Sequence, residues 1–219
     1  MRLLGSGKAQ IVNGLITMTI ADAQKEVRTV FLGGSVGQVV SGAIWLLSAG
    51  LSTWVGIREG IIALVAGGIF IYPLTQVVLR LLGHPWALPR GNPLRQLAVQ
   101  VAFIVPLTLP VVGGAALHNV NWFYPACMIV VGAHYLPFMF LYGMWQYGVL
   151  AAALLAGGFL LGTLAPHEFA LGGWFAGAAM LLFGIVAGGI ARRELSSVAS
   201  PPRQADRAEP GAAADRPRD

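Results

Sequence analysis

Residues Gly60 to Arg80 read GIIALVAGGIFIYPLTQVVLR, an apolar run with no charged side chain before its last position. A helix needs about 20 such residues to cross the hydrocarbon core of a bilayer. Five further stretches pass the same test, and none has Asp, Glu, Lys or Arg near its middle. We therefore expect six transmembrane helices, over residues 31–50, 60–80, 94–116, 122–142, 147–164 and 169–190.

The composition also favours a membrane protein over a soluble one. Of the 219 residues, 56% are hydrophobic and 11% are charged, whereas a soluble domain has about 25% charged residues. Too few charged side chains remain to cover a water-facing surface. The expected fold class is an all-α membrane protein, a bundle of about six transmembrane helices.

The breaks between the apolar runs are short or rich in turn residues. The longest, GHPWALPRGNP over residues 83–93, is too dense in Pro and Gly to stay helical. The breaks at 118–121, 143–146 and 165–168 are short enough to make neighbouring helices antiparallel. The pattern predicts three consecutive hairpins.

Lys and Arg are distributed unevenly over the two sides that this arrangement defines. Because cytoplasmic loops carry an excess of Lys and Arg, both termini are expected in the cytoplasm (N-in/C-in). Only Arg58 then lies outside. Nine basic residues lie on the cytoplasmic side, namely Arg2, Lys8, Lys25, Arg28, Arg80, Arg90, Arg95, Arg192 and Arg193. The net charge of +5 therefore indicates topology. The basic residues do not form a stripe interleaved with aromatic residues, so the sequence does not predict nucleic-acid binding.

Three regions are expected along the chain. Residues 1–29 form a cytoplasmic N-terminal segment, 30–192 the six-helix transmembrane domain and 193–219 a disordered cytoplasmic tail. The segment from Met18, MTIADAQKEVRTVF, predicts a short amphipathic interfacial helix, with Thr19 and Asp22 resembling a capping box. Residues 1–17 lack the features of a secretory signal, and Met18 is an alternative start.

Small residues recur four and seven apart in the last apolar run. They allow close approach of helix backbones, which drives packing in lipid. We expect contacts within the bundle, with a homo-oligomer interface on the same face as the alternative. The glycines are Gly173, Gly177, Gly184 and Gly188.

Polar side chains within the runs fall mostly in the cytoplasmic half, and the outer half reads as almost wholly apolar. One interpretation is a polar cavity open to the cytoplasm, and the other is hydrogen bonding between helices. Tyr142, Gln146 and Tyr147 also lie in this half and are not among the cavity-lining candidates. The cavity-lining candidates are Gln38, Ser41, Tyr72, Gln76, Gln100, His134 and Tyr135.

Metal, cofactor and catalytic signals are weak. His134 is the one histidine deep in a run, and it is interpreted as a hydrogen-bonded core residue or as a functional group. His118, His167 and Glu168 form only a weak alternative metal site outside the membrane. We expect no cofactor and no metal, and we assign no catalytic residue. Cys127, the single cysteine, is expected to be a buried hydrophobic residue.

Three stretches together resemble a known group of proteins. They are LGGSVGQVVSGAIWL from Leu32, GNPL from Gly91 and NWFYPACMIVVGAHYLPFMFLYG from Asn121. They resemble a family of uncharacterised bacterial multi-pass inner-membrane proteins, over about residues 30–162. The resemblance implies a location in the bacterial inner (plasma) membrane and a compact helical bundle, and it implies no site roles.

The leading functional hypothesis is binding or transport of a small neutral or amphipathic solute through the cytoplasm-facing cavity. The second is a non-catalytic structural or accessory subunit that packs through its glycine faces. The third is a membrane-embedded enzyme that uses His134. The expected partners are the lipid bilayer, a small-molecule ligand and, under the second hypothesis, another subunit.

Overall fold

The computed structural model describes residues 11–12, 15–16, 18–85 and 87–199. Most of the predicted segment before Met18 lies outside these residues, as does the predicted tail from residue 200 onward. The regular secondary structure in these residues is helical apart from two short strands. These are β1 (Ile11–Val12) and β2 (Leu15–Ile16), which pair antiparallel.

Six helices in the described part are long and apolar enough to cross a membrane, with mean hydropathy between 1.5 and 2.0. The shortest has 19 residues, about 28 Å at 1.5 Å per residue, against a hydrocarbon core of about 30 Å. The chain is a multi-pass integral membrane protein, as predicted. The spans are α2 (Ser35–Trp54), α3 (Ile57–Leu81), α4 (Arg95–His118), α5 (Phe123–Tyr142), α6 (Gln146–Leu164) and α7 (Leu171–Ala199).

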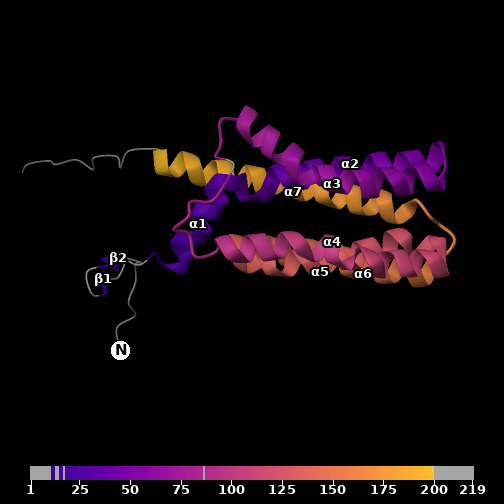
Figure 1. The fold of residues 1–219 in the computed structure, drawn as a ribbon. Helices are drawn as coiled ribbons and strands as arrows, with labels where there is room; N and C mark the ends of the chain where they lie inside the picture. The colour runs from indigo at the N-terminus through magenta and orange to yellow at the C-terminus, as the bar shows by residue number, and fades with distance from the viewer. Residues whose placement is uncertain (1–10, 13–14, 17, 86, 200–219) are drawn as a thin grey trace, which may run out of the picture.

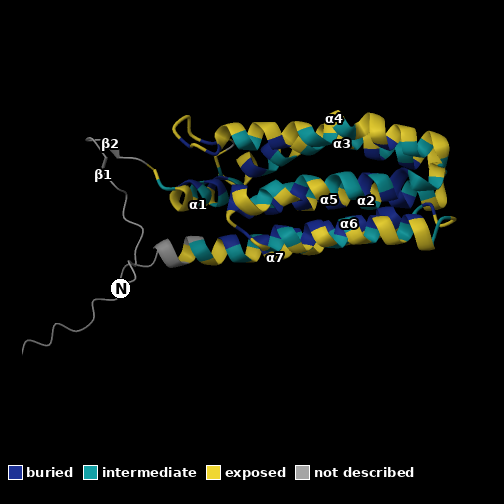
Figure 2. Cartoon of the chain, turned by 90° about the horizontal axis from the view of Figure 1, so that it is seen from below, coloured by how far each residue is buried: buried dark blue, intermediate teal, exposed yellow. Residues whose placement is uncertain are grey.

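The spans form two layers of three helices (Figure 1). In one layer α2 packs along α3 and α7, and in the other α5 packs along α4 and α6. Between the layers, α7 packs against α6 and α5, and side chains of α2 and α5 also meet. The sequence predicts α6 and α7 as the last hairpin. Their shared interface is smaller than that of α6 with α5 or that of α7 with α2. The outer spans α3 and α4 are the most exposed (Figure 2), with 11% of each apolar window buried.

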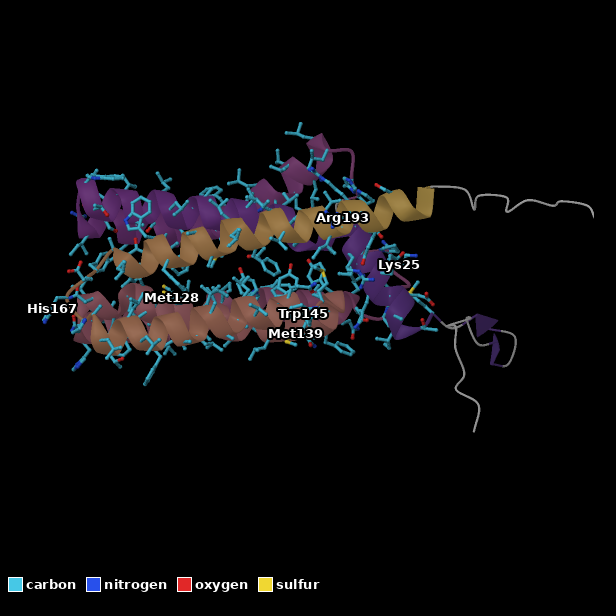
Figure 3. The ribbon with its side chains drawn as sticks, turned by 180° about the vertical axis from the view of Figure 1, so that it is seen from behind. Lys25, Met128, Met139, Trp145, His167 and Arg193 are labelled. Atoms are coloured by element: carbon cyan, nitrogen blue, oxygen red, sulfur yellow. The ribbon has the colours of Figure 1, made fainter. Side chains whose placement is uncertain are left out.

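The two ends of the bundle differ in what they contain. At one, the near end, lie α1 (Ile20–Phe31), the 83–94 loop and the last described turns of α7 (Figure 1). The loops that follow α2, α4 and α6 lie at the other, the far end, where Figure 3 labels His167. The beginning of α1 and the end of α7 therefore lie on the same side of the bundle.

The N-terminal helix α1 begins as predicted and ends in a sharp turn. The Thr19 hydroxyl accepts a hydrogen bond from the Asp22 backbone N–H at 3.1 Å, which caps the helix. The chain then enters the 3₁₀ turn η1 (Leu32–Gly34), where Gly33 and Gly34 have φ of 64° and 77°. Glycine adopts such angles without steric cost. The first span therefore begins at Ser35, four residues after the predicted start.

The last helix α7 packs its glycine face against α2. A Cβ added at any of four glycines would come within 3.2 Å of α2 atoms, so the two helices are in close contact. Residue numbers rise along one helix as they fall along the other, which makes the pair antiparallel. The facing pairs are Gly173 with Ala49, Gly177 with Leu46, Gly184 with Val39 and Gly188 with Ser35.

The α7 helix also continues further than predicted, to Ala199. The predicted span ended at residue 190 and the predicted tail began at residue 193. No Gly or Pro follows Gly189 until Pro201, and residues such as Arg192 and Glu194 are good helix formers. The described helix thus includes the first seven positions of the predicted tail.

The far half of the bundle contains a buried hydroxyl group cluster that the sequence interpretation missed. The Tyr124 hydroxyl lies 2.5 Å from Ser48 Oγ and 2.9 Å from Ser52 Oγ. Ser48 in turn donates to the Gly60 carbonyl at 2.7 Å. These contacts join α2, α3 and α5. Tyr124 and Ser48 are fully buried in this half and hydrogen-bond each other.

Candidate functional site

The near half of the bundle is filled by aromatic rings from α5, α6 and α7. Tyr135, Phe138 and Tyr142 follow one face of α5 at spacings of three and four residues. The Tyr147 ring lies between these and α7, with its centroid 5.1 Å from Tyr142, 5.3 Å from Phe138 and 4.7 Å from Phe183. We call these five residues the near-half aromatic group.

Gln38 brings α2 into contact with this group. Its side chain lies beside the hydroxyls of Tyr135 and Tyr147. The Tyr147 hydroxyl also donates to the Gly33 carbonyl at 2.9 Å. A Cβ at Gly34 would overlap the same hydroxyl, so the turn needs glycine there for close approach as well as for its φ. The entry to α2 and the aromatic group are thus fixed to each other.

His134 lies on the same helix as Tyr135 but is directed toward α4. Its ring meets Phe138 edge to face, with centroids 4.9 Å apart. The imidazole lies beside the backbone of Val101. Its Nδ1 atom is buried and has no hydrogen-bond partner.

Three glutamine side-chain oxygens are buried without a hydrogen-bond partner in the same way. Gln38 Oε1, Gln76 Oε1 and Gln146 Oε1 are buried and without a partner. With His134 Nδ1, they are all of the buried side-chain nitrogen and oxygen atoms that lack a partner in the described residues. They come from α2, α3, α5 and α6. Each residue lies in the near half of its helix.

The structure brings together only some of the predicted cavity-lining residues. Gln38 and Tyr135 are in contact, and Ser41, one turn further along α2, is also buried. Tyr72 is 64% exposed and Gln100 is exposed too, so these two face away from the core. They do not join the group.

The prediction left out the residues that turned out to be most central. Tyr142 and Tyr147 are almost completely buried, and each belongs to the aromatic group. The recurrence of Tyr135, Phe138 and Tyr142 on one helical face was a sequence signal that could have identified part of it. The position of Tyr147 could not be found in this way because it depends on how α6 packs on α5.

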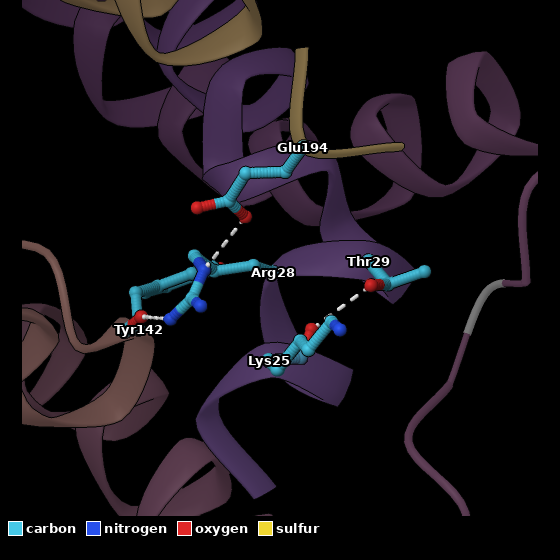
Figure 4. Close-up of polar contacts among 5 residues, drawn as sticks. All are labelled: Lys25, Arg28, Thr29, Tyr142 and Glu194. Carbon is cyan, nitrogen blue, oxygen red and sulfur yellow. Dashed lines mark hydrogen bonds and ion pairs between the residues drawn. The ribbon is translucent and has the colours of Figure 1, made fainter. Parts of the chain in front are cut away.

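The near end is closed over this group by α1. The Gln24 side chain donates to the Phe140 carbonyl at 2.6 Å. Arg28 donates to the Tyr142 carbonyl at 2.7 Å and pairs with Glu194 at 3.0 Å (Figure 4). On the other side, Asn92 donates to the Ala23 carbonyl at 3.1 Å. These contacts hold α1 across the ends of α5 and α7 and the 83–94 loop.

The described residues contain no cluster of metal-ligating side chains. No three His, Cys, Asp or Glu side chains lie close enough together there to hold a metal ion. His118, His167 and Glu168 therefore do not form the alternative metal site. Cys127 is buried, as expected. What the near half provides chemically is amide, imidazole and phenol groups.

Comparison with known proteins adds a family. A family of unknown function, DUF7010, matches residues 20–189. The chain belongs to this family. The DUF7010 match extends beyond the resemblance predicted over residues 30–162, and it takes in α1, five complete spans and most of α7. No curated protein and no solved structure matches the chain.

Proposed function

We propose that the protein binds a small neutral or amphipathic solute in the near half of the bundle and passes it across a bacterial inner membrane. One observation carries this proposal. The four buried polar atoms that lack partners in the described residues all lie in the near half, whereas the buried hydroxyls of Ser48 and Tyr124 in the far half are paired.

An unpaired buried polar atom has an energetic cost. Leaving a donor or acceptor without a partner destabilises a fold by about 1–3 kcal/mol. Most buried polar side-chain atoms in proteins therefore have a partner, which can be water or a ligand. In a membrane the alternative partner is hydrocarbon, which cannot form hydrogen bonds. Four such atoms in one half of the bundle favour an occupant there.

The distribution of charge supports an orientation with the near end in the cytoplasm. Arg58 lies at the far end, and the other described basic residues lie at the near end. An excess of Lys and Arg marks the cytoplasmic side. Both termini would then be cytoplasmic, and the solute would enter the near half from that side. The near-end basic residues are Lys25, Arg28, Arg80, Arg90, Arg95, Arg192 and Arg193.

The accessory-subunit alternative now lacks the surface first assigned to it. The α7 glycines lie against α2, so a partner or a second copy would need another face, such as the exposed sides of α3 and α4. The enzyme alternative rests on His134, whose neighbours include aromatic rings and a backbone group. Neither alternative explains why the unpaired atoms are confined to one half.

Cysteine accessibility tests the proposal. In a Cys127→Ala background, Gln76→Cys and His134→Cys should react with a membrane-impermeant maleimide added from the near-end side. Ser48→Cys, a buried site in the far half, is the matched control and should stay unlabelled. Gln100→Cys, which is exposed on α4, reports the reactivity of a site facing lipid. The proposal fails if Gln76→Cys and His134→Cys label no faster than Ser48→Cys.

A further inference from the structure

Two helix pairs in the bundle pack in the same way. A Cβ added at Gly42 of α2 would lie 2.9 Å from the carbonyl oxygen of Gly177 in α7. A Cβ added at Gly132 of α5 would lie 3.0 Å from the carbonyl oxygen of Ala151 in α6. A second contact recurs in each pair, namely Gly184 with the Ser35 carbonyl at 3.0 Å and Gly158 with the Pro125 carbonyl at 2.8 Å.

The two pairs also have the same register. In both contacts, a residue of α2 corresponds to the residue numbered 90 higher in α5, and a residue of α7 to the residue numbered 26 lower in α6. The sequence agrees with this register. Residues 39–46 read VVSGAIWL and residues 129–136 read IVVGAHYL, with four of the eight positions identical. Residues 177–184, GAAMLLFG, and residues 151–158, AAALLAGG, also share four of eight. The α2–α7 and α5–α6 pairs therefore repeat one packing arrangement.

The second pair is inverted relative to the first. The α2 helix runs from the near end to the far end and α5 runs back, and α7 and α6 are opposed in the same way (Figure 1). In many transporters, one inverted repeat rocks against the other and opens each side of the membrane in turn. Here the interface of α7 with α6 and α5 is smaller than the interface within either pair. Each pair is therefore suited to move as a unit.

Equivalent positions place a tyrosine against a glycine at each end of the bundle. At the far end, a Cβ added at Gly173 of α7 would lie 2.8 Å from Cε1 of Tyr124 in α5. The same register relates these two positions to Tyr147 of α6 and Gly34 before α2. A Cβ added at Gly34 would overlap the Tyr147 hydroxyl, so these two positions are also in contact. Each contact joins one helix pair to the other.

Both tyrosines close their end of the bundle. Tyr124 is 0% exposed and Tyr147 is 1% exposed. The Tyr147 hydroxyl donates to the Gly33 carbonyl at 2.9 Å, and the Tyr124 hydroxyl lies 2.9 Å from Ser52 Oγ. The structure is therefore closed at both contacts.

We infer that Tyr124 is the far gate and Tyr147 the near gate of an alternating-access mechanism, in which one tyrosine leaves its glycine while the other stays in place. The inference rests on the proposed function and assigns the residues that control access to the same site from each side. Two rigid pairs that rock about the middle of the bundle separate at one end only, because the contact at the other end is retained.

Ser41 is the position from which both gates can be tested. It is buried in α2, seven residues from Gly34 and seven from Ser48, the partner of Tyr124. Ser41→Cys in the full-length protein with Cys127→Ala gives one thiol between the gates. An impermeant maleimide is added to right-side-out and to inverted membrane vesicles, and labelling of Lys25→Cys identifies the preparation that exposes the near end.

The two gate variants should have opposite effects on the labelling of Ser41→Cys. Tyr147→Ala should raise the rate roughly tenfold from the near-end side and leave the far-end rate unchanged, and Tyr124→Ala should do the reverse, because each removes one closure and shifts the population toward one open state. Tyr72→Ala removes an exposed ring and is the control. It should change neither rate.

Conservative variants keep the test available if an alanine variant does not fold, as judged by circular dichroism. Tyr147→Phe and Tyr124→Phe keep the ring and remove only the hydroxyl. Each should give the same one-sided increase at roughly threefold, the effect of one hydrogen bond between membrane helices.

Two results would overturn the inference. If a tyrosine variant raises labelling equally from both sides, that residue only holds the bundle together. If neither tyrosine variant changes labelling, neither residue is a gate. In both cases the proposed function still stands when Gln76→Cys and His134→Cys label from the near-end side, and it fails as well when they do not.

Discussion

The Tyr124 hydroxyl joins α5 to α2 in the far half. It contacts Ser48 and Ser52 of α2 from α5, and through Ser48 the contact extends to the Gly60 carbonyl at the start of α3. The ring itself packs against Trp45, Phe123 and Phe169, with centroids 5.0–5.9 Å apart. This residue therefore links the two layers both by packing and by hydrogen bonding.

Removing only the hydroxyl separates the two contributions. Tyr124→Phe keeps the ring and should lower the free energy of unfolding by about 1 kcal/mol, because hydrogen bonds between membrane helices are worth about 0.6 kcal/mol each. Tyr72→Phe is the matched control, since Tyr72 is 64% exposed. The measurement is unfolding in mixed micelles followed by circular dichroism. Equal stability of the two variants would contradict the role given to Tyr124.

At the scale of the helix, apolar length and turn residues predict where most helices begin and end. The backbone angles of individual residues could not be predicted from the sequence. The breaks at residues 83–93 and 143–146 fall where the structure ends its helices. The start of α2 was misplaced because Gly33 and Gly34 adopt left-handed angles. Small residues within an apolar run are equally typical of a close helix contact, so the sequence alone does not reveal the turn.

The α2–α7 contact yields a prediction for one element. Gly177→Val should destabilise the bundle by about 1–3 kcal/mol, because its Cβ would lie 2.7 Å from Leu46 side-chain atoms and 3.0 Å from the Leu46 backbone. Gly189→Val makes the same change on the same helix where no atom lies within 4 Å, and it should be close to neutral. Thermal unfolding of both variants in micelles measures the difference. Similar loss in both would contradict a cost set by the α2–α7 contact.

Over the whole molecule, the six spans were predictable, and the candidate site was predictable only in part. Apolar length identifies a span regardless of its neighbours. Membership of the buried group depends on which face of each helix meets the others. That is why Gln38 and Tyr135 were found and Tyr72 and Gln100 did not join them. Helical periodicity shows which residues share one face of a helix. Whether that face contacts protein or lipid depends on how the helices pack.

The far-half hydroxyl cluster was missed for a related reason. Ser48 and Tyr124 are each polar at only one atom, and nothing in the sequence indicates that their hydroxyls pair. Their hydroxyls become important because α2 and α5 place them 2.5 Å apart. The contrast between a paired far half and an unpaired near half, on which the proposed function rests, is therefore a property of the assembled bundle.

The orientation of the molecule is the last prediction. In the Cys127→Ala background, Lys25→Cys on α1 and His167→Cys in the loop before α7 place one exposed thiol at each end of the bundle. In right-side-out membrane vesicles an impermeant maleimide should label His167→Cys and spare Lys25→Cys, because the excess of basic residues at the near end predicts a cytoplasmic location for it. Inverted vesicles should give the opposite result. Labelling of Lys25→Cys from outside would reverse the topology and move the near-half site to the opposite face of the membrane. The solute would then have to enter from that side.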